Sequence, residues 1–91
     1  MNQQALINAI NEAIPEAEAT STADFYGKNS ENNGTGIWIK GSEEYAADGK
    51  RIFNYQAAEG KSLHPKINKL VNGADWYEEP YDAVTCMLYK S

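Results

Sequence analysis

The sequence predicts a small α+β domain in which two amphipathic helices cover one face of an antiparallel sheet of about four strands. The chain has 91 residues, a length that fits a single domain spanning residues 1–91. Apolar residues recur at helical spacing near the N-terminus and again after residue 62. Elsewhere, short aromatic and β-branched runs alternate with turn residues, and strands joined by short turns favour antiparallel pairing.

A helix is expected over residues 3–14. Its apolar positions, from Leu6 to Ile14, lie at i, i+1, i+4 and i+8 and form one stripe. Pro15 ends the helix because the residue before a proline is disfavoured in the α-helical conformation. Residues 17–26 then alternate small apolar and polar groups, which predicts a strand with a thin inward face.

The middle of the chain is expected to form short strands and turns. Residues 27–36 are rich in Asn, Ser and Gly, which predicts a mobile hairpin loop. Ile37–Ile39 is β-branched and aromatic and predicts a strand. Asp48-Gly49 separates the apolar runs 45–47 and 51–55, and an Asp-Gly pair in this setting predicts a hairpin turn with positive φ at both central residues.

A second helix is expected from Ser62 to Asn72, where apolar residues recur every three or four positions. Ser62 is the expected N-cap, and Pro65 fits the first turn because its missing N–H is not needed there. Gly73 suits a left-handed C-cap.

The C-terminal segment predicts a short strand at Trp76–Glu78, a turn around Glu79–Asp82 and a longer strand at Ala83–Tyr89. The interruption is expected at Pro80, because proline cannot donate to a central ladder. In the last strand, Val84, Cys86 and Leu88 are expected to face one side of the sheet, and Ala83, Thr85, Met87 and Tyr89 the other.

Charge and cysteine content restrict the compartment and the partners. The chain carries 8 Lys+Arg and 13 Asp+Glu, a formal net charge of −5, and the acidic surplus lies mainly in residues 1–27. This excess disfavours direct binding to nucleic acid or to an anionic membrane. A single cysteine excludes an intramolecular disulfide, the N-terminus lacks the pattern of a secretion signal, and no apolar run approaches the ~18 residues of a membrane span. We therefore expect a cytoplasmic protein.

Few residues indicate catalysis or cofactor binding. One Cys and one His are too few for a zinc site, and no phosphate-binding loop occurs, so we expect no metal, no cofactor and no enzymatic activity. Cys86, in an apolar strand, is expected to be buried and unreactive. His64, at the expected start of the second helix, is expected to cap that helix or lie on the surface. Lys61, Lys66 and Lys69 cluster with His64 and fit a solvated helix face; a patch that faces phosphate or RNA is the alternative.

The strongest candidate for a functional surface combines aromatic and acidic residues. Tyr and Trp join a large apolar area to a polar tip and few rotatable bonds, so they dominate binding hot spots, and flanking carboxylates would steer a basic partner. Because adjacent strand residues alternate, one of Trp76 and Tyr77 must face the core. The predicted partner-binding residues are Asp75, Trp76, Tyr77, Glu78, Glu79, Tyr81 and Asp82.

We therefore expect a small, acidic, non-enzymatic domain that caps a basic surface of a larger protein as an inhibitor or adaptor, for example a phage- or mobile-element-encoded antagonist of a host system. Two alternatives stay open. The chain could form a homodimer or larger assembly through a sheet edge, at Ile37–Ile39 or Ala83–Tyr89. It could also be a small ligand-binding or enzyme subunit that uses His64.

Overall fold

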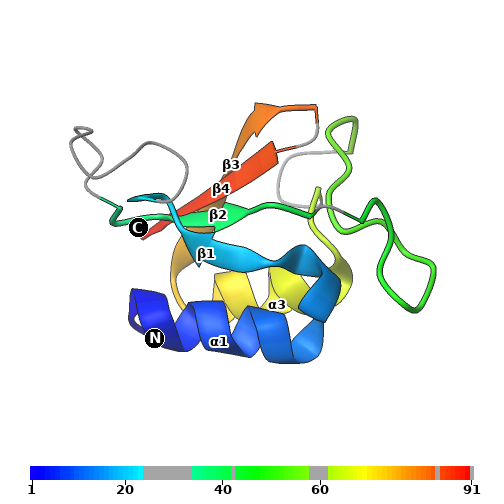
Figure 1. Cartoon of the computed structure of the whole chain (residues 1–91). Coiled ribbons are helices and arrows are strands. Elements are labelled where there is room, and N and C mark those ends of the chain that lie inside the picture. The colour runs from blue at the N-terminus through cyan, green and yellow to red at the C-terminus, as the bar shows by residue number, and fades with distance from the viewer. Residues whose placement is uncertain (24–33, 42, 58–61, 84, 91) are drawn as a thin grey trace.

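The fold places four antiparallel strands in one sheet and two helices against one of its faces (Figure 1). The computed structural model describes residues 1–23, 34–41, 43–57, 62–83 and 85–90. The α+β class expected from the sequence is confirmed. In chain order the elements are α1 (Gln3–Ala13), the 3₁₀ turn η1 (Pro15–Ala17), β1 (Ala19–Ser21), β2 (Ile37–Ile39), α3 (Pro65–Gly73), β3 (Trp76–Asp82) and β4 (Thr85–Lys90).

The strands lie in the order β1-β2-β4-β3, and every neighbouring pair is antiparallel. β2 and β4 are therefore central, and β1 and β3 form the two edges. The hypothesis of an open edge at Ile37–Ile39 or Ala83–Tyr89 is wrong, because β2 and β4 each have strand neighbours on both sides.

Both edge strands differ from their expected bounds. β1 begins only at Ala19, because Ala17 belongs to η1, and residues 24–26 of the expected strand lie outside the described residues, as does loop segment 27–33. β3 continues through Pro80, where a turn was expected. Proline is tolerated there because β3 is an edge strand, and the pairing irregularity falls just beyond it.

The first helix is confirmed and the ends of the second are corrected. Asn2 caps α1 by accepting the Ala5 N–H through Oδ1 at 2.8 Å. α3 begins at Pro65 and is capped by His64 rather than Ser62. The left-handed residue that follows α3 is Asp75, with φ 60°, whereas the expected Gly73 is the last helical residue. Asp tolerates this conformation better than most residues do, which explains why glycine is not needed.

Residues 45–55 form a turn but no extended strands. The Ala46 N–H donates to the Lys50 carbonyl at 2.8 Å, so the chain reverses around Asp48-Gly49 as expected. Only Gly49 of that pair has a positive φ, 83°, so the predicted two-residue turn type is wrong. The expected strands reduce to isolated bridges, because residues 52–54 divide their backbone hydrogen bonds between Glu44 and the 62–64 segment.

The two faces of the sheet have different environments. Cys86 and Leu88 of β4 join Ile37 and Ile39 of β2 in the core beneath the helices, which confirms the predicted alternation for these two residues. Val84, predicted for the same face, lies outside the described residues. Met87 points to the other face, yet only 1% of it is exposed, so side chains of that face must cover it. Among the described residues, no helix is long and apolar enough to cross a membrane.

Candidate protein-binding surface

The helix-free face of the sheet gathers most of the large side chains that the core does not use. Register places Trp38 of β2 beside Met87 of β4, Met87 beside Glu79 of β3, and Tyr89 beside Tyr77. Residues paired in this way point to the same face. A sixth residue, Tyr81, lines a hollow together with Glu79, Met87 and Tyr89. We call this set the aromatic face: Trp38, Tyr77, Glu79, Tyr81, Met87 and Tyr89.

The aromatic face has a packed base and exposed rings. The rings of Tyr77 and Tyr89 pack with centroids 6.1 Å apart at an interplanar angle of 42°. Tyr89 lies so close to Gly36 that a Cβ at that glycine would be 2.6 Å from its Cε1 atom. Tyr77 and Tyr81 are 47% and 54% exposed, whereas Met87 is buried. The aromatic face therefore exposes the rings of Tyr77 and Tyr81 to solvent, and the packed side chains of Met87 and Tyr89 lie beside them.

A hollow of about 250 Å³ opens on this face, lined by Glu79, Pro80, Tyr81, Met87 and Tyr89. Glu79 is exposed. Within the part of the chain that the structure describes, no hydrogen bond or ion pair uses its carboxylate. A negative charge therefore stands beside aromatic rings with its hydrogen-bonding capacity available to a ligand.

The predicted partner-binding residues divide between the two faces of β3. Tyr77, Glu79 and Tyr81 lie on the aromatic face. Asp75 and Asp82 are exposed near the two ends of the strand. The prediction that one of Trp76 and Tyr77 faces the core is confirmed.

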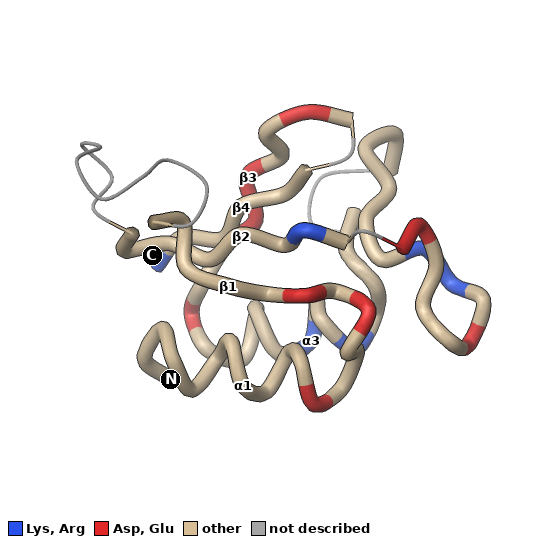
Figure 2. The backbone as a smooth tube through the Cα atoms, viewed as in Figure 1, with Lys and Arg blue, Asp and Glu red and all other residues tan. Residues whose placement is uncertain are grey.

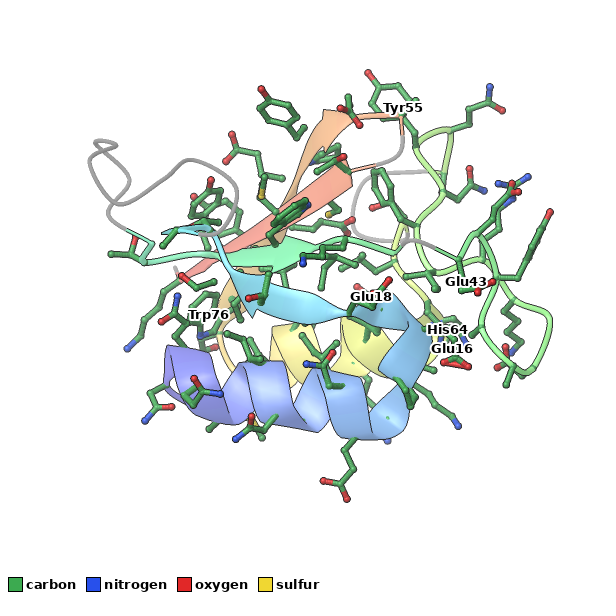
Figure 3. The ribbon with its side chains drawn as sticks, viewed as in Figure 1. Glu16, Glu18, Glu43, Tyr55, His64 and Trp76 are labelled. Atoms are coloured by element: carbon green, nitrogen blue, oxygen red, sulfur yellow. The ribbon has the colours of Figure 1, made fainter. Side chains whose placement is uncertain are left out.

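Trp76 and Glu78 belong to the opposite side of β3. Trp76 is 4% exposed and donates its indole N–H to the Met1 carbonyl at 3.3 Å, on the helix side of the sheet (Figure 3). Glu78 is half-buried and pairs with the core residue Leu88. Neither side chain belongs to the aromatic face, because strand alternation turns both toward the helices.

Three residues of the aromatic face were not predicted as binding residues. Trp38 comes from β2, and Met87 and Tyr89 come from β4. The alternation of the last strand places Met87 and Tyr89 together and its pairing with β3 brings them beside Tyr77, whereas Trp38 joins them only through the strand order.

Acidic charge follows β3. The strand contains Glu78, Glu79 and Asp82 and no basic residue. Figure 2 shows acidic positions along β3 and at the bend between η1 and β1, while basic positions lie on α3 and just beyond β2. Lys40 is one of the latter, and its Nζ lies 5.1 Å from the centre of the Trp38 ring. The aromatic face therefore already holds one cation over an aromatic ring.

The backbone edge of β3 is poorly suited to pairing with another strand. Pro80 lacks an N–H, the ladder is irregular between Pro80 and Asp82, and the strand is acidic. Prolines, irregularities and charges at an edge are features that prevent edge-to-edge association. The other edge, β1, has only three residues. Recognition through side chains of the aromatic face is therefore favoured over strand addition.

His64 is a structural residue at the start of α3. It is 1% exposed, so the expectation of a cap is confirmed and that of a surface position is wrong. Its Nδ1 accepts the Lys66 N–H at 3.1 Å, and its Nε2 lies 2.8 Å from Asp48 Oδ2. Because a backbone N–H only donates, Nδ1 must be unprotonated, and the ring proton on Nε2 is donated to Asp48. Both nitrogens are thus occupied.

The same contacts fix the 45–50 turn. The Lys50 backbone N–H and then the His64 ring hold the pKa of Asp48 below its ordinary value of 3.8. Glu16 accepts the Ala47 N–H at 3.1 Å. Asp48 therefore holds the turn against the start of α3, and Glu16 holds it against η1.

Cys86 is buried in β4, as expected. Burial, with a smaller contribution from the charge of Glu78, raises the pKa of its thiol from 9.0 to about 12. A thiol with so high a pKa holds almost no thiolate at neutral pH. Among the described residues, no group of three His, Cys, Asp or Glu side chains is arranged to hold a metal ion.

A hollow of about 760 Å³ lies between α1 and α3, with Met1 and Leu70 in its lining. Glu12, Lys66 and Lys69 also line it, so it carries charges of both signs. Lys61, the third basic residue of the predicted helix face, lies outside the described residues. Comparison with protein-family models, with curated proteins and with solved structures finds no match to this chain. The inference of function therefore depends on the surface itself.

Proposed function

We propose that this chain is a non-enzymatic, cytoplasmic protein-binding domain that caps a basic surface of a larger protein through its aromatic face, as an inhibitor or adaptor. A phage- or mobile-element-encoded antagonist of a host system is one example of such a protein. The observation that carries the proposal is the exposure of Tyr77 and Tyr81 on either side of the exposed acid Glu79, on a strand without a basic residue.

Two physical properties make this surface suitable for a protein partner. Exposed tyrosines lose little conformational entropy on binding and bury a large area, which is why they dominate hot spots. The acids of β3 and the net charge of −5 attract a positively charged surface and raise the association rate. The ordered base formed by Met87 and Tyr89 reduces the rearrangement that binding would require.

The geometry gives less support to the two alternatives, which are assembly through a sheet edge and a ligand-binding or enzyme subunit that uses His64. Assembly through a sheet edge would need β1 or β3, of which one is very short and the other carries Pro80 and acids. A chemical role for His64 would need a ring nitrogen that another group does not already occupy.

Charge reversal provides the test. The tagged protein is used to capture partners from a lysate of the source cell treated with nuclease, and they are identified by mass spectrometry. Glu79→Lys on the aromatic face, combined with Asp82→Lys at the adjoining end of β3, should abolish capture of a stoichiometric partner, and rising salt should weaken capture by the wild type. The matched control reverses two exposed acids outside the aromatic face, Glu12→Lys and Glu43→Lys, which alters net charge equally. An equal loss of capture in both double variants would show that binding depends on net charge alone, and it would contradict the proposed site.

A further inference from the structure

We propose that the hollow on the aromatic face receives the guanidinium group of one arginine side chain of the partner. This inference rests on the proposed function and names the chemistry that the face recognises. The hollow has a volume of about 250 Å³, which suits a side chain rather than a single water, whose share of liquid volume is about 30 Å³.

The lining of the hollow matches the parts of an arginine. Tyr81 and Tyr89 supply aromatic rings, Met87 supplies a buried thioether, and Glu79 supplies a carboxylate. A guanidinium can stack on an aromatic ring while its N–H groups donate to a carboxylate. The aliphatic part of the side chain would contact the rings and the methionine.

Arginine fits this lining better than lysine does. The guanidinium is planar and weakly hydrated, so it gives up water more easily than an ammonium group when it enters a partly enclosed, ring-lined hollow. Its paired donors also match the two oxygens of Glu79. No Lys or Arg lines the hollow, so no cation of the described chain competes for the site.

Cations lie over aromatic rings at two places among the described residues. The Arg51 guanidinium carbon lies 5.2 Å from the centre of the Tyr45 ring, and Lys40 lies over Trp38. Both pairs join neighbouring parts of the same molecule, whereas the hollow lined by Glu79, Tyr81 and Tyr89 would take its cation from the partner.

A short peptide tests the proposal without the natural partner. Acetyl-Gly-Arg-Gly-amide is titrated into protein carrying ¹³C-labelled methionine methyl groups and followed by NMR. The chain has only two methionines, so the buried Met87 methyl is a specific reporter of the hollow and Met1 is an internal control. The Met87 signal should shift, while the peptide with citrulline, which lacks the charge, should bind at least about fivefold more weakly. The lysine peptide should also bind more weakly than the arginine peptide.

Two variants test whether Glu79 supplies the negative charge that binds the arginine peptide. Glu79→Gln should weaken the arginine peptide at least about fivefold, and Glu12→Gln, which removes an exposed acid of α1, should leave the affinity unchanged. Equal binding of the arginine and citrulline peptides, or a shift at Met1 alone, would overturn the proposal.

The two proposals fail in different ways. If charge reversal abolishes partner capture but neither the peptide nor Glu79→Gln has an effect, the arginine site is wrong and the binding function stands. If the arginine peptide shifts Met87 but charge reversal at Glu79 and Asp82 leaves partner capture intact, the proposed function is wrong.

Discussion

Replacement of His64 tests whether this residue is a structural cap or a reactive group. The ring is 1% exposed, accepts the Lys66 N–H and contacts Asp48. His64→Ala removes both contacts and leaves space where the ring was. We expect the variant to fold, to be clearly less stable, and to retain partner binding below its melting temperature.

The magnitude follows from the contacts. Loss of an N-cap costs about 1 kcal/mol. Removal of a buried ring adds about 1–3 kcal/mol, at the lower end of large-to-small core substitutions. The pair with Asp48 is left out of the sum, because 40% of that side chain is exposed to water. The total, about 2–4 kcal/mol, lowers the melting temperature of a domain of this size by roughly 10–25 °C.

Urea unfolding at neutral pH, followed by tryptophan fluorescence, measures the change. Two conservative variants separate the contacts of the ring. His64→Asn keeps an oxygen that can accept the Lys66 N–H, and His64→Gln keeps an amide that can donate toward Asp48. Both should be more stable than His64→Ala. A loss below about 0.5 kcal/mol for His64→Ala, the size usual for surface substitutions, would refute the structural role. Loss of binding at unchanged stability would favour the reactive group.

Three further predictions concern other parts of the fold. Iodoacetamide at pH 8 should modify Cys86 at least about a thousandfold more slowly in the folded than in the unfolded chain, because folding raises the pKa of the thiol from 9.0 to about 12. For the same reason, the free energy of unfolding should fall as the pH rises from about 9 to about 12. Because folding lowers the pKa of Asp48, its ionised carboxylate stabilises the fold at pH values above the ordinary pKa of 3.8. This stabilisation is lost as the pH falls through the lowered pKa, and the free energy of unfolding of Asp48→Asn, measured against pH, should not show that loss. Gly36→Ala would place a Cβ 2.6 Å from Tyr89 and 2.8 Å from the Leu88 carbonyl, so it should destabilise the protein by about 1–3 kcal/mol in urea and shift the NMR signals of the Tyr89 ring.

Local patterns predicted the parts of the fold that depend on neighbouring residues. The stripe from Leu6 to Ile14 and the following Pro15 located α1, because helical periodicity and a proline stop are both local signals. The alternation in β4 likewise separated Cys86 from Met87. Helix ends were harder to predict, since the cap of α3 depends on a buried histidine whose partner, Asp48, comes from the preceding turn.

The strand order was the main feature that local patterns did not provide. β2 pairs with β4 although α3 and β3 lie between them in the chain, and no periodicity specifies such a contact. For this reason the acid and tyrosines of β3 were predicted, but the contribution of Trp38 was not. The same missing information led to the wrong edge. Trp76 was included in the site because alternation shows that one of Trp76 and Tyr77 faces the core but not which one.

The most direct test of the proposed function uses the exposed tyrosines and the purified partner. Tyr77→Ser with Tyr81→Ser removes both exposed rings of the aromatic face, and Tyr45→Ser with Tyr55→Ser removes two similarly exposed rings elsewhere. Isothermal titration calorimetry compares their affinities for the partner with that of the wild type. The account predicts a loss of about a hundredfold or more for the first variant, as for truncated hot-spot residues, and little change for the second. Equal affinity of the first variant and the wild type would contradict the central claim that the aromatic face binds the partner.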